Sequence, residues 1–450
     1  MGLRAPTERI AGCCLLAMLV LAVPGAADCP RGVLLITIDA LRTDRVSGYG
    51  YGRPTSPNID ALLARGARFT EARTVEPLTN PALTSLLTSL PPHAHCATRN
   101  GLRAKPGLAS LAKAVRTRGW VAGAFLASWT LKDRISRLAE HFDHYETVLT
   151  RRRWLGIINR EATAADVRER AVAWLDDQVA GGREAPVLLW VHFVEPHAPY
   201  RLQRGFAERL GVSSAAATRS DRYDSEVAFT DQEVGRLLAQ VEERLGRADL
   251  LVVLLADHGE SLGEHDYWGH GRQLYEPMLR IPLGLTWPAV IPVRVIDTPV
   301  VITDVAPTIL ELIGVDVPAG FAGQSLARTL RTGEDLSGRP LCFQTHRGAV
   351  KGQHDSDRAR SRGLLSVAVV VDGRKEILEM GGDLRQVFDL EPDPGETLSR
   401  VSPDSEPSSE AMACLGQVAE GLEAADAEIP ASVLDNESRA RLQELGYLDD

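Results

Sequence analysis

Residues 32–38 read GVLLITI and are followed by Asp39. A continuous apolar run of this kind predicts a strand buried on both faces, as parallel strands between two helix layers are. Because helical patterns alternate with such runs, we predict an α/β three-layer sandwich with a mostly parallel central sheet. The other runs of the same character are VAGAFL (121–126), PVLLWVHF (186–193) and DLLVVLLA (249–256).

The predicted helices between these strands have recognisable ends. The segment SPNIDALLARGARF has Ser56 as the expected N-cap, Pro57 in the first turn and Gly66 where the helix is expected to stop. Further helical patterns cover residues 161–179, 220–245 and 303–314.

The pattern changes after about Ser337, where short strand-like segments replace the strand–helix alternation. They predict a small C-terminal α+β subdomain with an antiparallel sheet. The polar residues 402–410 are expected to form a loop, and residues 438–448 a short closing helix. We therefore divide the chain into a signal peptide (1–27), an α/β domain (30–337), and a C-terminal antiparallel subdomain with a tail (338–450). The strand-like segments are 339–346, 364–373, 374–380 and 385–390.

Composition and the N-terminus indicate an exported globular protein. Apolar residues make up 44% of the chain and the net charge is -10, which argues against nucleic acid as the main partner. Residues 10–23 form an apolar run after Arg4 and Arg9, and Ala27 ends a small-residue cleavage site. We expect a secreted or periplasmic protein; an uncleaved N-terminal anchor, and with it membrane contact, is the alternative. Cleavage would leave four scattered cysteines, which allow one or two disulfides of undetermined pairing: Cys29, Cys96, Cys342 and Cys414.

Polar residues follow several predicted strands, where open parallel sheets bind their ligands. Two carboxylates and an imidazole, from Asp39, Asp257 and His258, suit a divalent cation. Thr79 is a candidate fourth ligand, because it opens a predicted helix whose N-terminus would favour a phosphate or sulfate group. The alternative for Thr79 is an ordinary helix cap. Other polar residues at strand ends are His197, Ser128 and Thr130.

Four blocks of this sequence resemble the sulfatase family of the alkaline phosphatase superfamily: residues 34–69 (beginning LLITIDAL), LTSLLTSLPPHAH (83–95), HFVEPHAPY (192–200) and ADHGESLGEHDYWGHGRQLYEPMLRIPL (256–283). The resemblance runs from about Gly32 to about Glu396. It implies one divalent cation (Ca, Mn or Zn) held by Asp39, Thr79, Asp257 and His258. It also implies catalytic roles for Thr79, His197 and His270, substrate contacts for Asn100, Ser128 and Thr130, and indirect roles for His192, Glu260 and His265.

Two departures from the family pattern bear on mechanism. Ala40 occupies a place where many relatives have a second Asp, and Leu83 stands at the arginine of Cys/Ser-x-Pro-x-Arg. The nucleophile position is Thr79, which cannot be oxidised to formylglycine, so none is expected. Relatives that use Thr act on phosphodiesters or transfer phosphate-containing groups.

The resemblance thus implies a metal-dependent hydrolase of sulfate or phosphate esters, with in-line attack by Thr79 through a covalent intermediate. The substrate would be a small-molecule, glycan or lipid ester. Three alternatives remain: a phospho-group transferase, a catalytically degenerate binding protein with the same fold, and a two-metal phosphatase or nuclease. The last of these would need three more ligands.

Overall fold

The computed structural model describes Gly2 and residues 29–153, 157–180, 185–336, 338–346, 363–380, 384–401 and 405–428. Apart from Gly2, the predicted signal peptide lies outside these ranges, as does the helix expected at residues 438–448. Within the described ranges, no helix is both long enough and apolar enough to cross a membrane.

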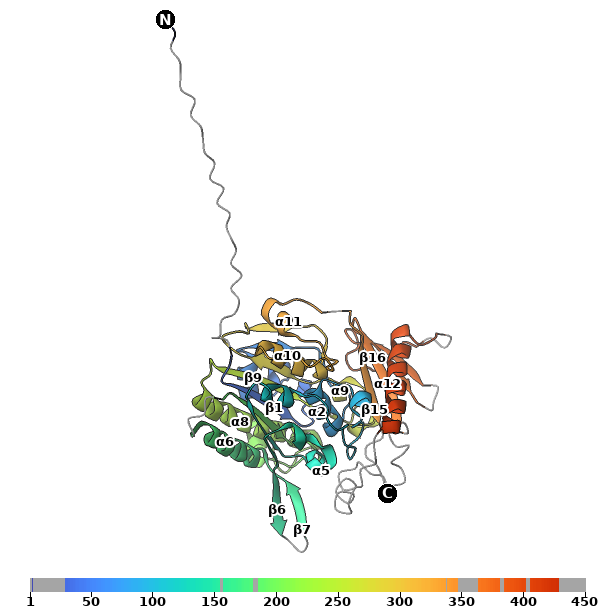
Figure 1. The fold of residues 1–450 in the computed structure, drawn as a ribbon. Helices are drawn as coiled ribbons and strands as arrows, with labels where there is room; N and C mark the ends of the chain where they lie inside the picture. Colours follow the sequence, from blue (N-terminus) through green and yellow to red (C-terminus); the bar gives the residue numbers. More distant parts are fainter. Residues whose placement is uncertain are drawn as a thin grey trace.

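An eight-stranded sheet forms the centre of the molecule (Figure 1). Its strands, in spatial order, are β13 (Arg294–Ile296), β2 (Ala67–Phe69), β12 (Leu283–Thr286), β9 (Leu250–Ala256), β1 (Gly32–Ile38), β8 (Val187–Phe193), β4 (Val121–Leu126) and β5 (His144–Thr147). β12 is antiparallel to both of its neighbours, and the other pairs are parallel. All seven residues of β1 are buried, as its apolar run predicts. The predicted mostly parallel sheet is therefore confirmed.

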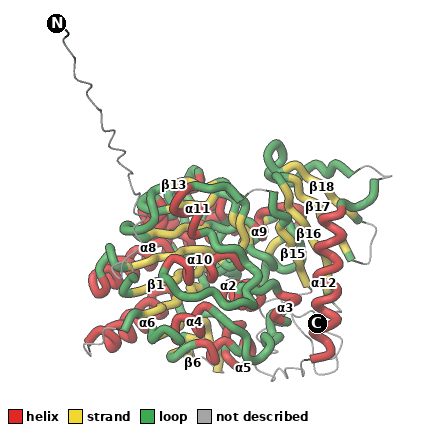
Figure 2. Tube along the Cα trace, turned by 45° about the horizontal axis from the view of Figure 1, so that its top comes forward, coloured by secondary structure: helices red, strands yellow, loops and turns green. Residues whose placement is uncertain are grey.

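Helices cover the sheet on either side (Figure 2). In one group, α8 (Arg219–Leu245) contacts both α1 (Pro57–Leu63) and α6 (Ala164–Ala180). The other contains α2 (Thr79–Thr88), α4 (Leu111–Arg116) and α10 (Val305–Leu312). Shorter elements are β3 (Ala72–Arg73), α3 (Pro92–His95), α5 (Asp133–Ser136), β6 (Leu149–Arg153), β7 (Ile157–Glu161), α7 (Arg204–Arg209), β10 (Ser261–Leu262), β11 (Trp268–Gly269), α9 (Glu276–Leu279), β14 (Val300–Val301) and α11 (Ala327–Thr332).

Ser56 occupies the predicted N-cap position of α1 and Pro57 its first turn, but the predicted end of the helix was wrong. The Ser56 side chain makes no capping hydrogen bond to the helix backbone and instead bonds Asp60 and Ser47. The helix ends at Leu63, before Gly66. Gly66 is needed for another reason: a Cβ there would collide with the carbonyl oxygen of Leu285 on β12. The glycine therefore permits close backbone approach within the sheet.

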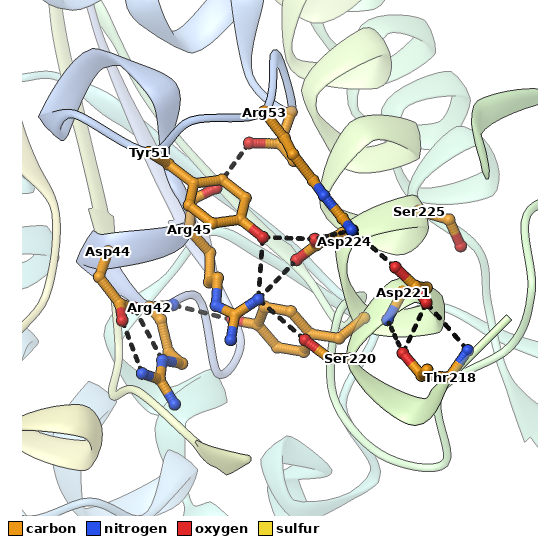
Figure 3. A network of polar contacts seen from close by, with 12 residues as sticks. Arg42, Asp44, Arg45, Tyr51, Arg53, Thr218, Ser220, Asp221, Asp224 and Ser225 are labelled. Carbon is orange, nitrogen blue, oxygen red and sulfur yellow. Dashed lines mark hydrogen bonds and ion pairs between the residues drawn. The ribbon is translucent and has the colours of Figure 1, made fainter. Parts of the chain in front are cut away.

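The segment that follows β1 is tied to α8 by a polar network (Figure 3). The Tyr223 hydroxyl donates to the carbonyl of Ala40 at 2.7 Å and accepts from the N–H of Arg42 at 2.9 Å. Arg45 and Arg53 both pair with the buried carboxylate of Asp224. These contacts fix the backbone directly after Asp39, where Ala40 has a φ of 56°.

The C-terminal subdomain contains the predicted antiparallel sheet, made of β15 (Leu341–His346), β16 (Leu364–Val371), β17 (Arg374–Glu379) and β18 (Arg385–Asp389). Helix α12 (Ser409–Glu428) packs against β16 and was not predicted from the sequence. A disulfide between Cys342 and Cys414 joins β15 to this helix. Cys29 is exposed, and Cys96 is buried.

A buried ionic cluster joins this antiparallel sheet to β3 and α9. Lys375 on β17 is fully buried and lies 3.1 Å from Glu276 and 2.7 Å from Glu396. Arg73 contacts Glu276 from the other side at 2.9 Å. Burial alone would raise the pKa of Glu276, but Arg73 and Lys375 bring it well below its usual value. The carboxylate is therefore charged, and its neighbours must remain in place to offset the cost of burial.

We predict that Lys375→Met lowers the free energy of unfolding by about 3 to 5 kcal/mol, because two buried carboxylates would lose their shared cation. Urea unfolding followed by circular dichroism measures this. The matched control is Lys113→Met, which breaks a partly exposed pair with Glu140 and should cost under about 1 kcal/mol. Equal losses in the two variants would contradict the proposed importance of the cluster.

Candidate active site

Three strand ends bring polar side chains to one place. Ile38 on β1 pairs in register with Ala256 on β9, so Asp39 and Asp257 follow neighbouring strands side by side. His192 lies on β8 beside Thr37. One ligand atom from each of Asp39, His192 and Asp257 lies within 4.8 Å of the others, and all three residues are buried. Such a group of donors is a candidate metal site.

The hydrogen bonds of His258 reveal which of its nitrogens faces this group. Its Nδ1 lies 2.8 Å from the carbonyl oxygen of Gly259. Because a carbonyl can only accept, Nδ1 carries the proton and Nε2 is left with a lone pair in the neutral ring. This Nε2 lies 3.5 Å from Asp39 Oδ1, 3.6 Å from Asp257 Oδ2 and 3.4 Å from Thr79 Oγ1. A lone pair facing two carboxylate oxygens fits a cation between them.

The pKa shifts of Asp257 and His258 also fit a cation at this position. Burial, and then the neighbouring Asp39, raise the pKa of Asp257 well above its usual value. Burial lowers the pKa of His258 well below its usual value, so that ring is neutral. Without a cation the two carboxylates repel each other, whereas a divalent cation would stabilise both in their charged form. Asp39, His192, Asp257 and His258, with the Thr79 hydroxyl, therefore fit a divalent cation.

His192 is closer to this centre than the indirect role inferred from the sequence. Its Nε2 lies 3.7 Å from Asp39 Oδ2, and its Nδ1 lies 2.9 Å from the hydroxyl of Thr37. A hydrogen bond at the second ring nitrogen is a common way of orienting a metal-binding histidine. One sequence signal could have found it: His192 is the polar exception in a strand that is otherwise apolar.

Thr79 is the first residue of α2 and not its cap. Leu78 occupies the N-cap position and makes no side-chain cap. The capping hydrogen bond comes from Asn100, whose Oδ1 accepts from the N–H of Asn80 at 3.1 Å. Among the described residues, the Nδ2 of Asn100 has no hydrogen-bond partner. Thr79 Oγ1 is thus left to face His258, next to helix N–H groups that favour an anion.

His270 and His197 extend the group outward. The His270 ring centroid lies 4.2 Å from that of His258 and 5.0 Å from that of His197. His270 Nδ1 lies 3.0 Å from Glu260 Oε1, and His197 Nδ1 lies 2.6 Å from the carbonyl oxygen of Ala198. Burial alone would raise the pKa of Glu260, but the two histidines bring it below its usual value. Glu260 is therefore a buried carboxylate behind His270.

The remaining predicted residues lie less directly at this centre. The hydroxyls of Ser128 and Thr130 are buried after the end of β4 and bond to each other at 2.9 Å. Ala127 donates to the carbonyl of His192, so this segment lies at the same edge of the sheet. The ring of His265 stacks on Tyr275 at 3.6 Å, which gives it a packing contact instead of one with the group.

The chain belongs to the sulfatase family: residues 31–315, more than half of the sequence, match that family. The family comprises hydrolases of ester bonds. YidJ, an uncharacterized sulfatase of Escherichia coli (strain K12), is 24% identical over 353 residues, which cover 65% of this chain and 70% of the relative. The ulvan-active sulfatase of Formosa agariphila is 23% identical over 334 residues, 66% of this chain and 65% of the relative. The match therefore spans just under two thirds of that relative.

Solved structures share the fold over most of their length. A putative sulfatase from Bacteroides thetaiotaomicron superposes with a TM-score of 0.69 at 19% identity, covering 91% of this chain and 99% of that one. The phosphonate monoester hydrolase of Agrobacterium radiobacter gives a TM-score of 0.66 at 20% identity, covering 89% and 96%. At these identities the similarity shows the alkaline phosphatase-like fold.

We predict that Asp257→Asn weakens metal binding by at least about 100-fold while the fold persists, because the amide cannot supply the charge that the site needs. Metal content per chain after dialysis measures this, with circular dichroism as the check on folding. Asp266→Asn removes an exposed carboxylate from the same loop and should leave the metal content unchanged. Stoichiometric metal in Asp257→Asn would exclude this site.

Proposed function

We propose that this protein is a metal-dependent hydrolase of sulfate or phosphate esters that uses Thr79 as its nucleophile. The observation that carries the proposal is the position of Thr79 Oγ1, 3.4 Å from His258 Nε2 and at the N-terminus of α2. A hydroxyl beside a cation site and a helix N-terminus is placed to attack a tetrahedral anion.

The proposed reaction has two displacements. A bound divalent cation would favour ionisation of the Thr79 hydroxyl and offset the negative charge of the ester. Thr79 loses its proton to solvent, and its oxygen bonds to sulfur or phosphorus as the bond to the alcohol oxygen breaks. His270 Nε2 donates a proton to the departing alcohol. In the second displacement, water attacks the same centre and gives a proton to His270 as the bond to the Thr79 oxygen breaks. Thr79 regains a proton from solvent, and sulfate or phosphate is released.

The substrate class follows from the residues around Thr79. Leu83 is fully buried where the family pattern has an arginine, and no aldehyde can form from threonine. These two features favour phosphoryl esters, whereas the relatives' names point to sulfate esters. One solved relative is in complex with its substrate D-glucosamine-2-N,6-O-disulfate. The buried carboxylates and imidazoles described above support one cation, and the two imidazoles favour Mn or Zn over Ca.

Thr79→Ala tests the nucleophile. We expect turnover to fall by roughly three orders of magnitude or more, because water would have to replace a positioned oxygen. Thr79→Ser should retain part of the activity. Paired sulfate and phosphate esters of one phenol provide the assay, and a slow substrate should leave a mass increment on the Thr79 peptide.

The control is Thr88→Ala, which removes a buried hydroxyl from the far end of the same helix. This variant should keep its turnover. Undiminished turnover in Thr79→Ala would leave a water molecule as the nucleophile and reject the covalent route.

We further propose that Glu260 positions His270 and stabilises its protonated form. Glu260→Gln keeps an acceptor but removes the charge, so protonation of the alcohol becomes harder. We expect kcat to fall by about 100-fold for an alkyl ester but by less than about tenfold for a 4-nitrophenyl ester, whose leaving group departs without a proton.

Glu264→Gln is the control for this comparison, because Glu264 lies in the same loop and pairs with Arg42. It should not change the ratio between the two esters. Equal losses for both esters in Glu260→Gln would mean that Glu260 has only a structural role.

We also propose that the protein is exported, as its apolar residues 10–23 suggest. The Cys342–Cys414 disulfide supports this proposal, because disulfides persist in oxidising compartments. Cell fractionation tests it, and a cytosolic protein that retains Met1 would reject it.

A further inference from the structure

An exposed tryptophan lies close to the proposed general acid. Trp268 is on β11, two residues before His270, in a hairpin with β10 that continues directly from Glu260. Its side chain is 42% exposed, whereas Trp129 and Trp190 are fully buried in the core. A large aromatic surface left open beside a reaction centre is a feature of ligand-binding sites.

A cation is held against this indole. The guanidinium carbon of Arg219 lies 4.3 Å from the centroid of the Trp268 ring and 5.3 Å from that of Tyr200. Arg219 is exposed at the start of α8, and no carboxylate among the described residues pairs with it. Its position is therefore set by aromatic rings, and its hydrogen-bonding edge remains available to an anion.

Tyr200 connects this pair to the reacting centre. It follows His197 by three residues, and its pKa is raised by burial and then by the neighbouring Glu260 carboxylate. Arg219 lies over the ring of Tyr200, Tyr200 has Glu260 as a neighbour, and Glu260 contacts His270. This series of contacts links Trp268 and Arg219 to the place where the departing alcohol would be protonated.

We propose that Trp268 and Arg219 form a subsite for the leaving alcohol and select a ring-shaped alcohol that bears a second anionic group. The indole contacts the apolar face of the ring, and the guanidinium binds the carboxylate, sulfate or phosphate substituent in a forked geometry. This inference rests on the proposed function, because it assigns the side of the site that the alcohol occupies.

The test compares two esters of the same acid, the phenyl ester and the 3-carboxyphenyl ester. Their phenols are of similar acidity, so the chemical step is matched and the carboxylate is the main difference. The wild-type protein should favour the carboxylated ester in kcat/KM by roughly tenfold at low salt. The preference should shrink as ionic strength rises, because the pair is exposed.

Arg219→Ala should abolish this preference, because kcat/KM should fall more for the carboxylated ester than for the phenyl ester, and Arg219→Lys should restore part of it. Trp268→Ala should raise KM for both esters without a matching fall in kcat. Arg236→Ala removes another exposed cation from α8 and should leave the preference intact.

The experiments distinguish a failure of the proposed function from a failure of the proposed subsite. If Thr79→Ala hydrolyses the phenyl ester as fast as the wild type does, the proposed function fails. If Thr79 is required but the wild type shows no preference, or Arg219→Ala retains it, only the subsite is rejected. Unchanged KM values in Trp268→Ala would reject the part assigned to the indole.

Discussion

Two carboxylates buried side by side are the constraint on which the site depends. Asp39 and Asp257 come together because β1 and β9 are parallel and in register up to their last residues. Asp257 Oδ1 accepts from the N–H groups of Ala40 and His258, at 3.1 and 2.8 Å. Asp257 Oδ2 has no hydrogen-bond donor among the described residues. One oxygen of the Asp257 carboxylate is thus fully hydrogen-bonded by the protein backbone, and the other faces the place where a cation fits.

Three histidines near these carboxylates share one hydrogen-bonding arrangement, but it has different consequences for each of them. His258, His197 and His270 each direct Nδ1 at an acceptor, which leaves Nε2 to face other groups. For His258 the acceptor is a carbonyl and burial keeps the ring neutral, as a metal ligand must be. For His270 the acceptor is the buried Glu260 carboxylate, 3.0 Å away. The acceptor at Nδ1 therefore distinguishes a histidine suited to bind a metal from one suited to act as the proposed general acid.

Features that depend on local sequence pattern could be predicted from the sequence. Features that depend on packing between distant segments were predicted less well. The apolar runs predicted β1, β4, β8 and β9 within a residue of their observed ends, and residues after strand ends met as expected. His192 was expected to have only an indirect role, because its approach to Asp39 depends on the pairing of β8 with β1. Helix α12 was missed because Gly416 and Gly421 are unfavourable in a helix. A Cβ at Gly421 would lie 2.6 Å from the ring of His93, so that glycine serves contact between distant segments.

The same long-range packing joins the C-terminal sheet to the segment that leads into Thr79, the proposed nucleophile. The N–H of Gln344 on β15 donates to the carbonyl of Val75, and His346 Nδ1 lies 3.0 Å from Glu76 Oε1. Burial raises the pKa of Glu76 and lowers that of His346 to about 3, so the pair is neutral and can stay buried without a counterion. These contacts fix the backbone three residues before Thr79. Because β15 is itself held to α12 by the disulfide, the position of Thr79 Oγ1 depends on a part of the chain that supplies none of the proposed metal ligands.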